Sequence, residues 1–140
     1  LTGEKISIHN QRESTKESTY DFVYFVLDMN REKLYQRINL RVDQMLREGL
    51  VQEVKELISE GCKAGMTSME GIGYKQLVPY LEGKCDLESA ISQIKQDTRH
   101  FAKRQMTWFR GMERRGFNIN WIDAELPLEE KTEQILRLIG

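Results

Sequence analysis

The hydrophobic positions change their spacing along the chain, and each spacing predicts a type of element. Residues 1–20 are polar without a period, so we expect a loop there. Residues 21–28 (DFVYFVLD) form a short run of β-branched and aromatic side chains, which predicts a strand. A continuously apolar run is typical of a strand in a parallel sheet, where both faces are covered. Residues 117–122 (FNINWI) are the best candidate for a second strand.

The rest of the chain has helical spacing, and particular residue types mark where helices begin. Asn30 and Asp86 are candidate N-caps, residues 67–70 (TSME) have the form of a capping box, and Pro127 suits a first helical turn. The predicted helices cover residues 31–48, 50–60, 68–82, 87–115 and 127–139. We therefore expect a mainly α-helical chain with two short strands. Two strands alone make a poor sheet, which indicates that part of the fold lies outside this sequence.

The helix predicted over residues 87–115 separates its side chains onto two faces at about 100° per residue. An apolar arc predicted to face the core contains Ile91, Ile94, Phe101, Trp108, Phe109 and Met112. A nearly opposite basic arc contains Lys95, Arg99, Lys103, Arg110 and Arg114. Trp108 has two interpretations. An aromatic ring among cations stacks on unpaired bases, but its place on the apolar arc favours packing in the core.

Charge is concentrated in the same helix. The chain of 140 residues has a formal net charge of −1, whereas residues 95–115 carry +5. Neighbouring cations repel one another, and no acidic residue of this helix neutralises most of them. An anionic partner is the simplest explanation, and nucleic-acid phosphates fit an elongated row of cations. The alternative is an ordinary solvated helix face.

Composition argues against several other classes of protein. The two cysteines, 23 positions apart, fit neither a CxxC pair nor a disulfide-rich scaffold, and with only two histidines we expect no metal site. The longest apolar run, residues 22–27, is too short to cross a membrane. We therefore expect a soluble cytoplasmic protein. Because residue 1 is Leu rather than Met, we also expect a piece of a longer chain.

Two smaller features have open interpretations. Gly71 and Gly73 stand early in a predicted helix with Lys75 just beyond them, which is typical of a close approach by a ligand or by another backbone. The alternative is tight helix packing. Arg41 borders an apolar stripe, from which it could reach into a polar pocket and bind a phosphate. The alternative is a surface arginine paired with an acid such as Glu32 or Glu48.

Three stretches together resemble a known family. Residues 34–57 (LYQRINLRVDQMLREGLVQEVKEL), 70–83 (EGIGYKQLVPYLEG) and 98–110 (TRHFAKRQMTWFR) are similar to the C-terminal half of bacterial tRNA dimethylallyltransferases, the tRNA isopentenyltransferase family. The resemblance implies a fragment of an α/β fold of the P-loop kinase type, carrying a helical insertion that binds tRNA. It also implies transfer of a dimethylallyl group from dimethylallyl diphosphate to N6 of the adenine 3′ of the anticodon. Magnesium would assist, and the protein would be a monomer.

The same resemblance implies roles for particular residues. Arg41 matches the arginine that contacts the diphosphate. The anticodon stem-loop of tRNA would be contacted by Glu70, Gly71, Ile72, Gly73, Tyr74, Lys75, Lys103, Arg104, Gln105, Met106, Thr107, Trp108, Phe109 and Arg110, supported by Lys95, Arg99 and Arg114. The family's GPTxxGK[ST] loop and its general-base aspartate have no counterpart here, and we expect them upstream of Leu1. We therefore expect the magnesium ligands outside this segment and the 140 residues alone to be inactive.

Two other functional classes remain open at this stage. One is a stand-alone helical module that binds nucleic acid without chemistry, and the other is a helical scaffold whose basic face meets an acidic protein. A salt titration of RNA binding separates them, because a steep fall of affinity with salt indicates several phosphate contacts.

Overall fold

The computed structural model describes residues 21–63 and 65–140, and the loop predicted over residues 1–20 lies outside the described residues. The elements, in chain order, are β1 (Tyr24–Asp28), α2 (Arg31–Arg47), α3 (Leu50–Ser59), the 3-10 turn η1 (Thr67–Met69), α4 (Tyr74–Leu81), α5 (Leu87–Arg114), β2 (Ile119–Asp123) and α6 (Leu128–Ile139). The prediction of a mainly helical chain with two short strands is confirmed for this part of the chain. None of its helices is both long and apolar enough to span a bilayer.

Strands β1 and β2 pair in parallel, with Tyr24 opposite Ile119 and Asp28 opposite Asp123. Parallel strands need a long crossover, and here the four helices α2 to α5 connect them. Strand β1 begins three residues later than predicted, because residues 21–23 take no part in the pairing. Strand β2 is shifted two residues along the chain from its predicted start.

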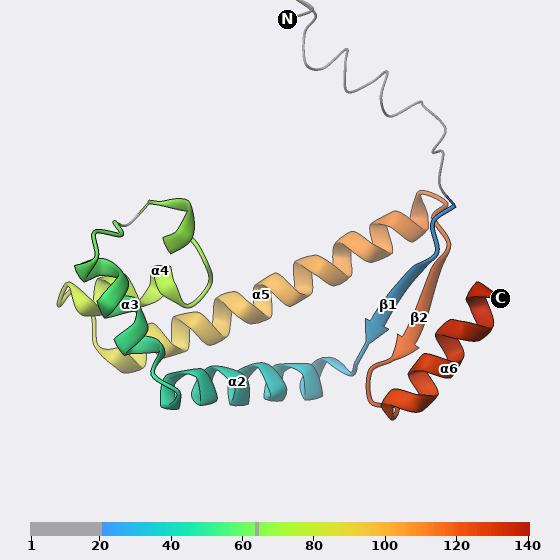
Figure 1. Cartoon of the computed structure of the whole chain (residues 1–140), viewed down its shortest axis with the longest axis horizontal. Coiled ribbons are helices and arrows are strands. Elements are labelled where there is room, and N and C mark those ends of the chain that lie inside the picture. The colour runs from blue at the N-terminus through green and yellow to red at the C-terminus, as the bar shows by residue number, and fades with distance from the viewer. Residues whose placement is uncertain (1–20, 64) are drawn as a thin grey trace, which may run out of the picture.

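Buried apolar side chains gather at the two ends of α5, which crosses the molecule diagonally in Figure 1. At the helical end, α2, α3 and α4 pack with the first half of α5 around Val54, Leu77 and Ile94. At the other end, Val26 and Ile119 of the two strands pack against Met112. The 28 residues of α5 span about 42 Å at 1.5 Å per residue, so this one helix joins two cores.

Two predicted helix caps are confirmed. The Asn30 side chain accepts hydrogen bonds from the backbone N–H groups of Glu32 and Lys33, and Asp86 accepts one from Ser89. The Ser89 hydrogen bond holds the pKa of Asp86 below its usual value. Pro127 stands one residue before α6 rather than inside its first turn.

The capping box predicted at residues 67–70 is wrong. These residues form the isolated turn η1, and α4 begins only at Tyr74. A continuous helix over residues 68–82 is excluded because Gly73 has φ +110° and ψ −54°, far from helical values. Instead of starting a helix, the turn places Met69 in the core, where it is 1% exposed.

Candidate nucleic-acid interface

The basic arc of α5 divides into two parts, and its first part is occupied by α2. Lys95 Nζ lies 2.6 Å from Asp43 Oδ1. Arg99 donates a hydrogen bond to Asn39 Oδ1 at 2.8 Å, and its guanidinium carbon lies 6.0 Å from the centroid of the Tyr35 ring. For these two cations the anionic partner inferred from the sequence is therefore not required, because α2 packs alongside α5 and supplies Asp43 and Asn39.

The second part of the arc is free to meet an anion. Lys103, Arg110 and Arg114 are exposed, and none of their side chains forms an ion pair or hydrogen bond with a described residue. Together with Arg104, they place positive charge over the last three turns of α5. Because no described acid neutralises Lys103, Arg110 or Arg114, this half of the helix is the better candidate for phosphate contacts.

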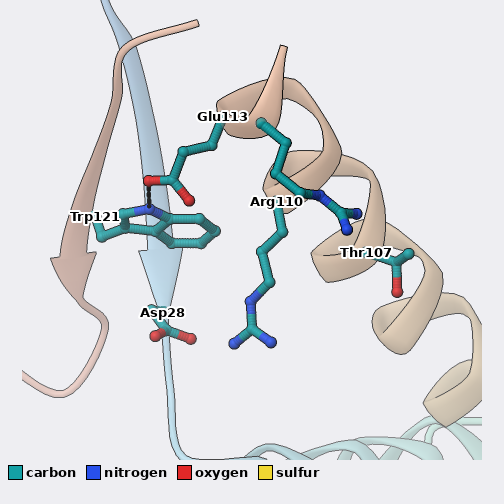
Figure 2. A pocket seen from close by; sticks show the side chains of 6 residues that line it. Asp28, Thr107, Arg110, Glu113 and Trp121 are labelled. Carbon is teal, nitrogen blue, oxygen red and sulfur yellow. Dashed lines mark hydrogen bonds between the residues drawn. The ribbon is translucent and has the colours of Figure 1, made fainter. Parts of the chain in front are cut away.

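A cleft of about 520 Å³ opens beside these cations (Figure 2). Arg110 extends into it from α5, and Asp28 lies across it at the end of β1. Trp121 closes one side and donates a hydrogen bond from Nε1 to Glu113 Oε1 at 3.0 Å. The cleft therefore lies between the last turns of α5 and the sheet, against the middle of β2 and the carboxyl end of β1.

A second cleft, of about 260 Å³, continues the first toward the start of α2. Both clefts share Asp28, Thr107 and Arg110, and the second extends to Arg31 and Lys103. The two clefts therefore adjoin and form one groove along α5, which faces β2 at one end and the start of α2 at the other, where Arg31 lies opposite Lys103 and Arg110.

Trp108 lies outside the core, which corrects the interpretation favoured from periodicity. Its side chain is 57% exposed, and Phe101, one heptad earlier, is 45% exposed. The Trp108 ring packs edge-on against Phe109, with ring centroids 5.2 Å apart. Ile94 and Met112 are buried as predicted. The difference arises because the two cores lie at the ends of α5, and no described element covers Phe101 and Trp108 between them.

The exposed indole borders a depression of about 510 Å³. Its other lining residues are His100, Lys103, Arg104 and Thr107. An aromatic face beside two cations is the combination that recognises an unpaired base together with its phosphates.

The turn that begins at Gly71 leads into α4, whose first residues are Tyr74 and Lys75. Tyr74 donates a hydrogen bond from its hydroxyl to Glu53 of α3, which raises the pKa of this phenol and keeps it protonated. Lys75 is exposed in the first turn of α4. Tight packing does not explain Gly71, since an added Cβ would meet no described atom within 4 Å.

We expect Gly73→Ala to destabilise the fold and Gly71→Ala to leave it nearly unchanged. Gly73 has φ +110°, a conformation that costs an L-residue about 1–3 kcal/mol, whereas Gly71 has no such value and open space around it. Urea unfolding of the two variants measures the difference. A loss of RNA affinity in Gly71→Ala, without loss of stability, would indicate that a ligand approaches Gly71 closely.

Arg41 is exposed on α2, and no described residue pairs with it. The alternative in which Glu32 or Glu48 neutralises it is therefore wrong. The preceding Leu40 is 66% exposed, so this part of α2 is not covered by the described elements. Arg41 is available to an anion, but it lies apart from the clefts along α5.

Some features of the site were not found from the sequence. Trp121 bonds Glu113 across the turn between α5 and β2, and Gln76 bonds Asp97 across the contact of α4 with α5, so both depend on how consecutive elements pack. A usable signal for Gln76 was its polar side chain next to Leu77 and Val78 in a short amphipathic helix. Among the described residues, no group of three or more His, Cys, Asp or Glu could hold a metal ion.

Comparison with known proteins identifies relatives along the whole chain. The family model described as IPP transferase matches residues 1–112. A protein of Lachnoclostridium phytofermentans named tRNA dimethylallyltransferase is 54% identical over 110 residues, covering 79% of this chain and 35% of the relative. A protein of the same name from Carboxydothermus hydrogenoformans is 47% identical over 140 residues. The matched region covers 99% of this chain and 43% of the relative.

The fold is shared with solved structures. The crystal structure of a tRNA isopentenylpyrophosphate transferase from Staphylococcus epidermidis matches with TM-score 0.80 and 38% identity, over 99% of this chain and 44% of that one. The crystal structure of the full-length tRNA isopentenylpyrophosphate transferase from Bacillus halodurans matches with TM-score 0.79 and 39% identity, over 93% of this chain and 42% of that one. The chain thus spans less than half the length of the relatives it matches. It belongs to the IPP transferase family.

Proposed function

We propose that this chain is part of a tRNA dimethylallyltransferase, which transfers a dimethylallyl group from dimethylallyl diphosphate to N6 of the adenine 3′ of the anticodon. Membership of the IPP transferase family and the names of the relatives support this activity. The observation that carries the role of this segment is the set of cations on α5, Lys103, Arg110 and Arg114, which lack described partners beside the groove. In this proposal the segment binds the anticodon stem-loop through these cations and the turn at residues 70–75.

The transfer forms a bond from adenine N6 to C1 of the dimethylallyl group and breaks the bond from C1 to oxygen. The diphosphate leaves with the electron pair, and the N6 proton passes to a base. We assign Arg41 to the leaving diphosphate, because the resemblance matches it to the arginine that contacts the diphosphate. A guanidinium binds two phosphate oxygens at once and stabilises the charge that develops on them. Trp108 would stack on an unpaired base of the loop.

Among the described residues, no group of three or more His, Cys, Asp or Glu could hold a metal ion, and in this proposal the magnesium ligands lie in the remainder of a longer protein. We therefore assign no step involving magnesium to this segment. The general base and the phosphate-binding loop likewise have no candidate here, so we propose that the remainder of a longer protein provides them.

The activity is tested with the full-length protein and a synthetic anticodon stem-loop carrying adenine next to the anticodon. We expect a labelled dimethylallyl group to be incorporated, and none when guanine replaces that adenine. Salt-dependent binding without incorporation would instead support a module that binds nucleic acid without chemistry.

We expect Lys103→Ala to weaken stem-loop binding and to lower the slope of log affinity against log salt by about one unit, as for loss of one phosphate contact. Fluorescence anisotropy at several salt concentrations measures this slope. Lys55→Ala is the matched control, because Lys55 is also exposed but lies on α3. An unchanged slope in Lys103→Ala would place this side chain away from phosphate.

A further inference from the structure

One polar side chain is buried between α4 and α5. Gln76 is 7% exposed and is the only buried polar residue among those that the structure describes. Its neighbours Leu77 and Val78 belong to the helical core, so an apolar residue would be the ordinary choice at this position. A buried amide needs partners for both its oxygen and its nitrogen.

Gln76 uses both ends of its amide to join two segments. Its Oε1 accepts a hydrogen bond of 2.8 Å from the backbone N–H of Gly73. Its Nε2 donates one of 2.6 Å to Asp97 Oδ2 on α5. The other oxygen of Asp97 accepts a hydrogen bond of 2.9 Å from Gln93, which holds this carboxylate on its own helix.

These hydrogen bonds fix the turn before α4 relative to α5. The turn depends on Gly73 and its unusual backbone angles, and Gln76 binds that same residue. Asp97 stands six residues before Lys103, or about 9 Å along the helix axis. The link therefore adds a directional contact to the apolar packing of α4 on α5 and helps to fix where Lys75 lies relative to the free cations of α5.

We propose that the link from Gln76 to Asp97 is a positioning device for RNA binding. It rests on the proposed function, since it assumes that the turn and the free cations bind the same RNA. Holding the two surfaces at a fixed spacing before the RNA arrives removes an ordering cost from binding. An apolar side chain would fill the space without holding the turn to α5.

The test is a swap of the two partners in the full-length protein. Gln76→Glu replaces the donor amide by a carboxylate facing Asp97, and we expect it to weaken stem-loop affinity roughly tenfold. We also expect the salt slope to fall by about one unit, because Lys75 leaves its position. Combining it with Asp97→Asn restores a donor and an acceptor, so the double variant should bind within about twofold of wild type.

Two further variants separate positioning from charge and from folding. Gln52→Glu makes the same change of charge on the exposed face of α3, where Gln52 also donates to a carboxylate, and should leave affinity within about twofold of wild type. Gln76→Met keeps the side-chain volume but removes both hydrogen bonds, and it should also weaken stem-loop binding. It replaces Gln76→Glu as the test if that variant does not fold. Thermal melting shows which variants are folded at the assay temperature.

The outcomes are distinguishable. Weakened binding in folded Gln76→Glu or Gln76→Met, together with restoration in the double variant, supports the positioning role. The proposal is overturned if folded variants at Gln76 bind like wild type, or if the folded double variant stays as weak as Gln76→Glu. Wild-type protein without salt-dependent binding to the stem-loop would instead overturn the proposed function on which the link depends.

Discussion

Replacing Arg41 by alanine is expected to lower kcat/KM for dimethylallyl diphosphate about 10- to 100-fold, while stem-loop affinity stays close to wild type. A hydrogen bond to a charged group is worth about 1.5–3 kcal/mol, which corresponds to this range. Because the Arg41 side chain is exposed and has no described partner, its removal should not disturb the fold. Steady-state kinetics of the full-length protein, with the diphosphate varied at saturating RNA, measure the effect.

Arg47→Ala is the matched control for Arg41→Ala. Arg47 is also exposed on α2 and lies in its last turn, outside the residues assigned to substrate. Arg41→Lys should recover only part of the activity, since an ammonium cannot bind two phosphate oxygens in the planar geometry of a guanidinium. Unchanged kcat and KM in Arg41→Ala would remove this residue from the proposed mechanism.

Local features of the sequence were the most predictable part of the fold. The caps at Asn30 and Asp86 depend on side chains that bond backbone groups two or three residues away, so neighbouring residues contain the information. The start of α4 was not predictable in this way, because residues 67–70 match a capping pattern equally well. A helix that starts at residues 67–70 is prevented by the backbone of Gly73, which is linked to α5 through the hydrogen bonds of Gln76.

Helical periodicity shows which side chains share a face, but it does not show what covers that face. Ile94 and Trp108 lie on the same arc of α5, yet one is 2% exposed and the other 57%. The helix is longer than either core, so its apolar arc continues past the elements that cover it. Likewise, the partners of Lys95 and Arg99 come from α2, more than 50 positions away, and no pattern within α5 could indicate them.

Trp108→Ala is the second large effect that we expect, and it concerns RNA rather than stability. Stacking on one base is worth about 1–3 kcal/mol by alanine substitution, so stem-loop affinity should fall about tenfold or more. Unfolding free energy should change by no more than about 0.5 kcal/mol, as for other surface positions. A tryptophan packed in a core would instead cost about 3–5 kcal/mol on truncation to alanine. Anisotropy and urea unfolding of the full-length protein measure the two quantities separately.

Two further variants test whether the effect of Trp108→Ala comes from loss of base stacking. Trp108→Phe keeps an aromatic face and should recover most of the RNA affinity, because stacking tolerates different rings. Leu136→Ala removes a side chain that is 62% exposed on α6 and should change neither quantity. Loss of stability with unchanged RNA affinity in Trp108→Ala would mean that another part of the full-length protein packs on the indole. In that case the RNA surface of α5 would be reduced to its cations, and affinity would depend on Lys103, Arg110 and Arg114 together with the turn at residues 70–75.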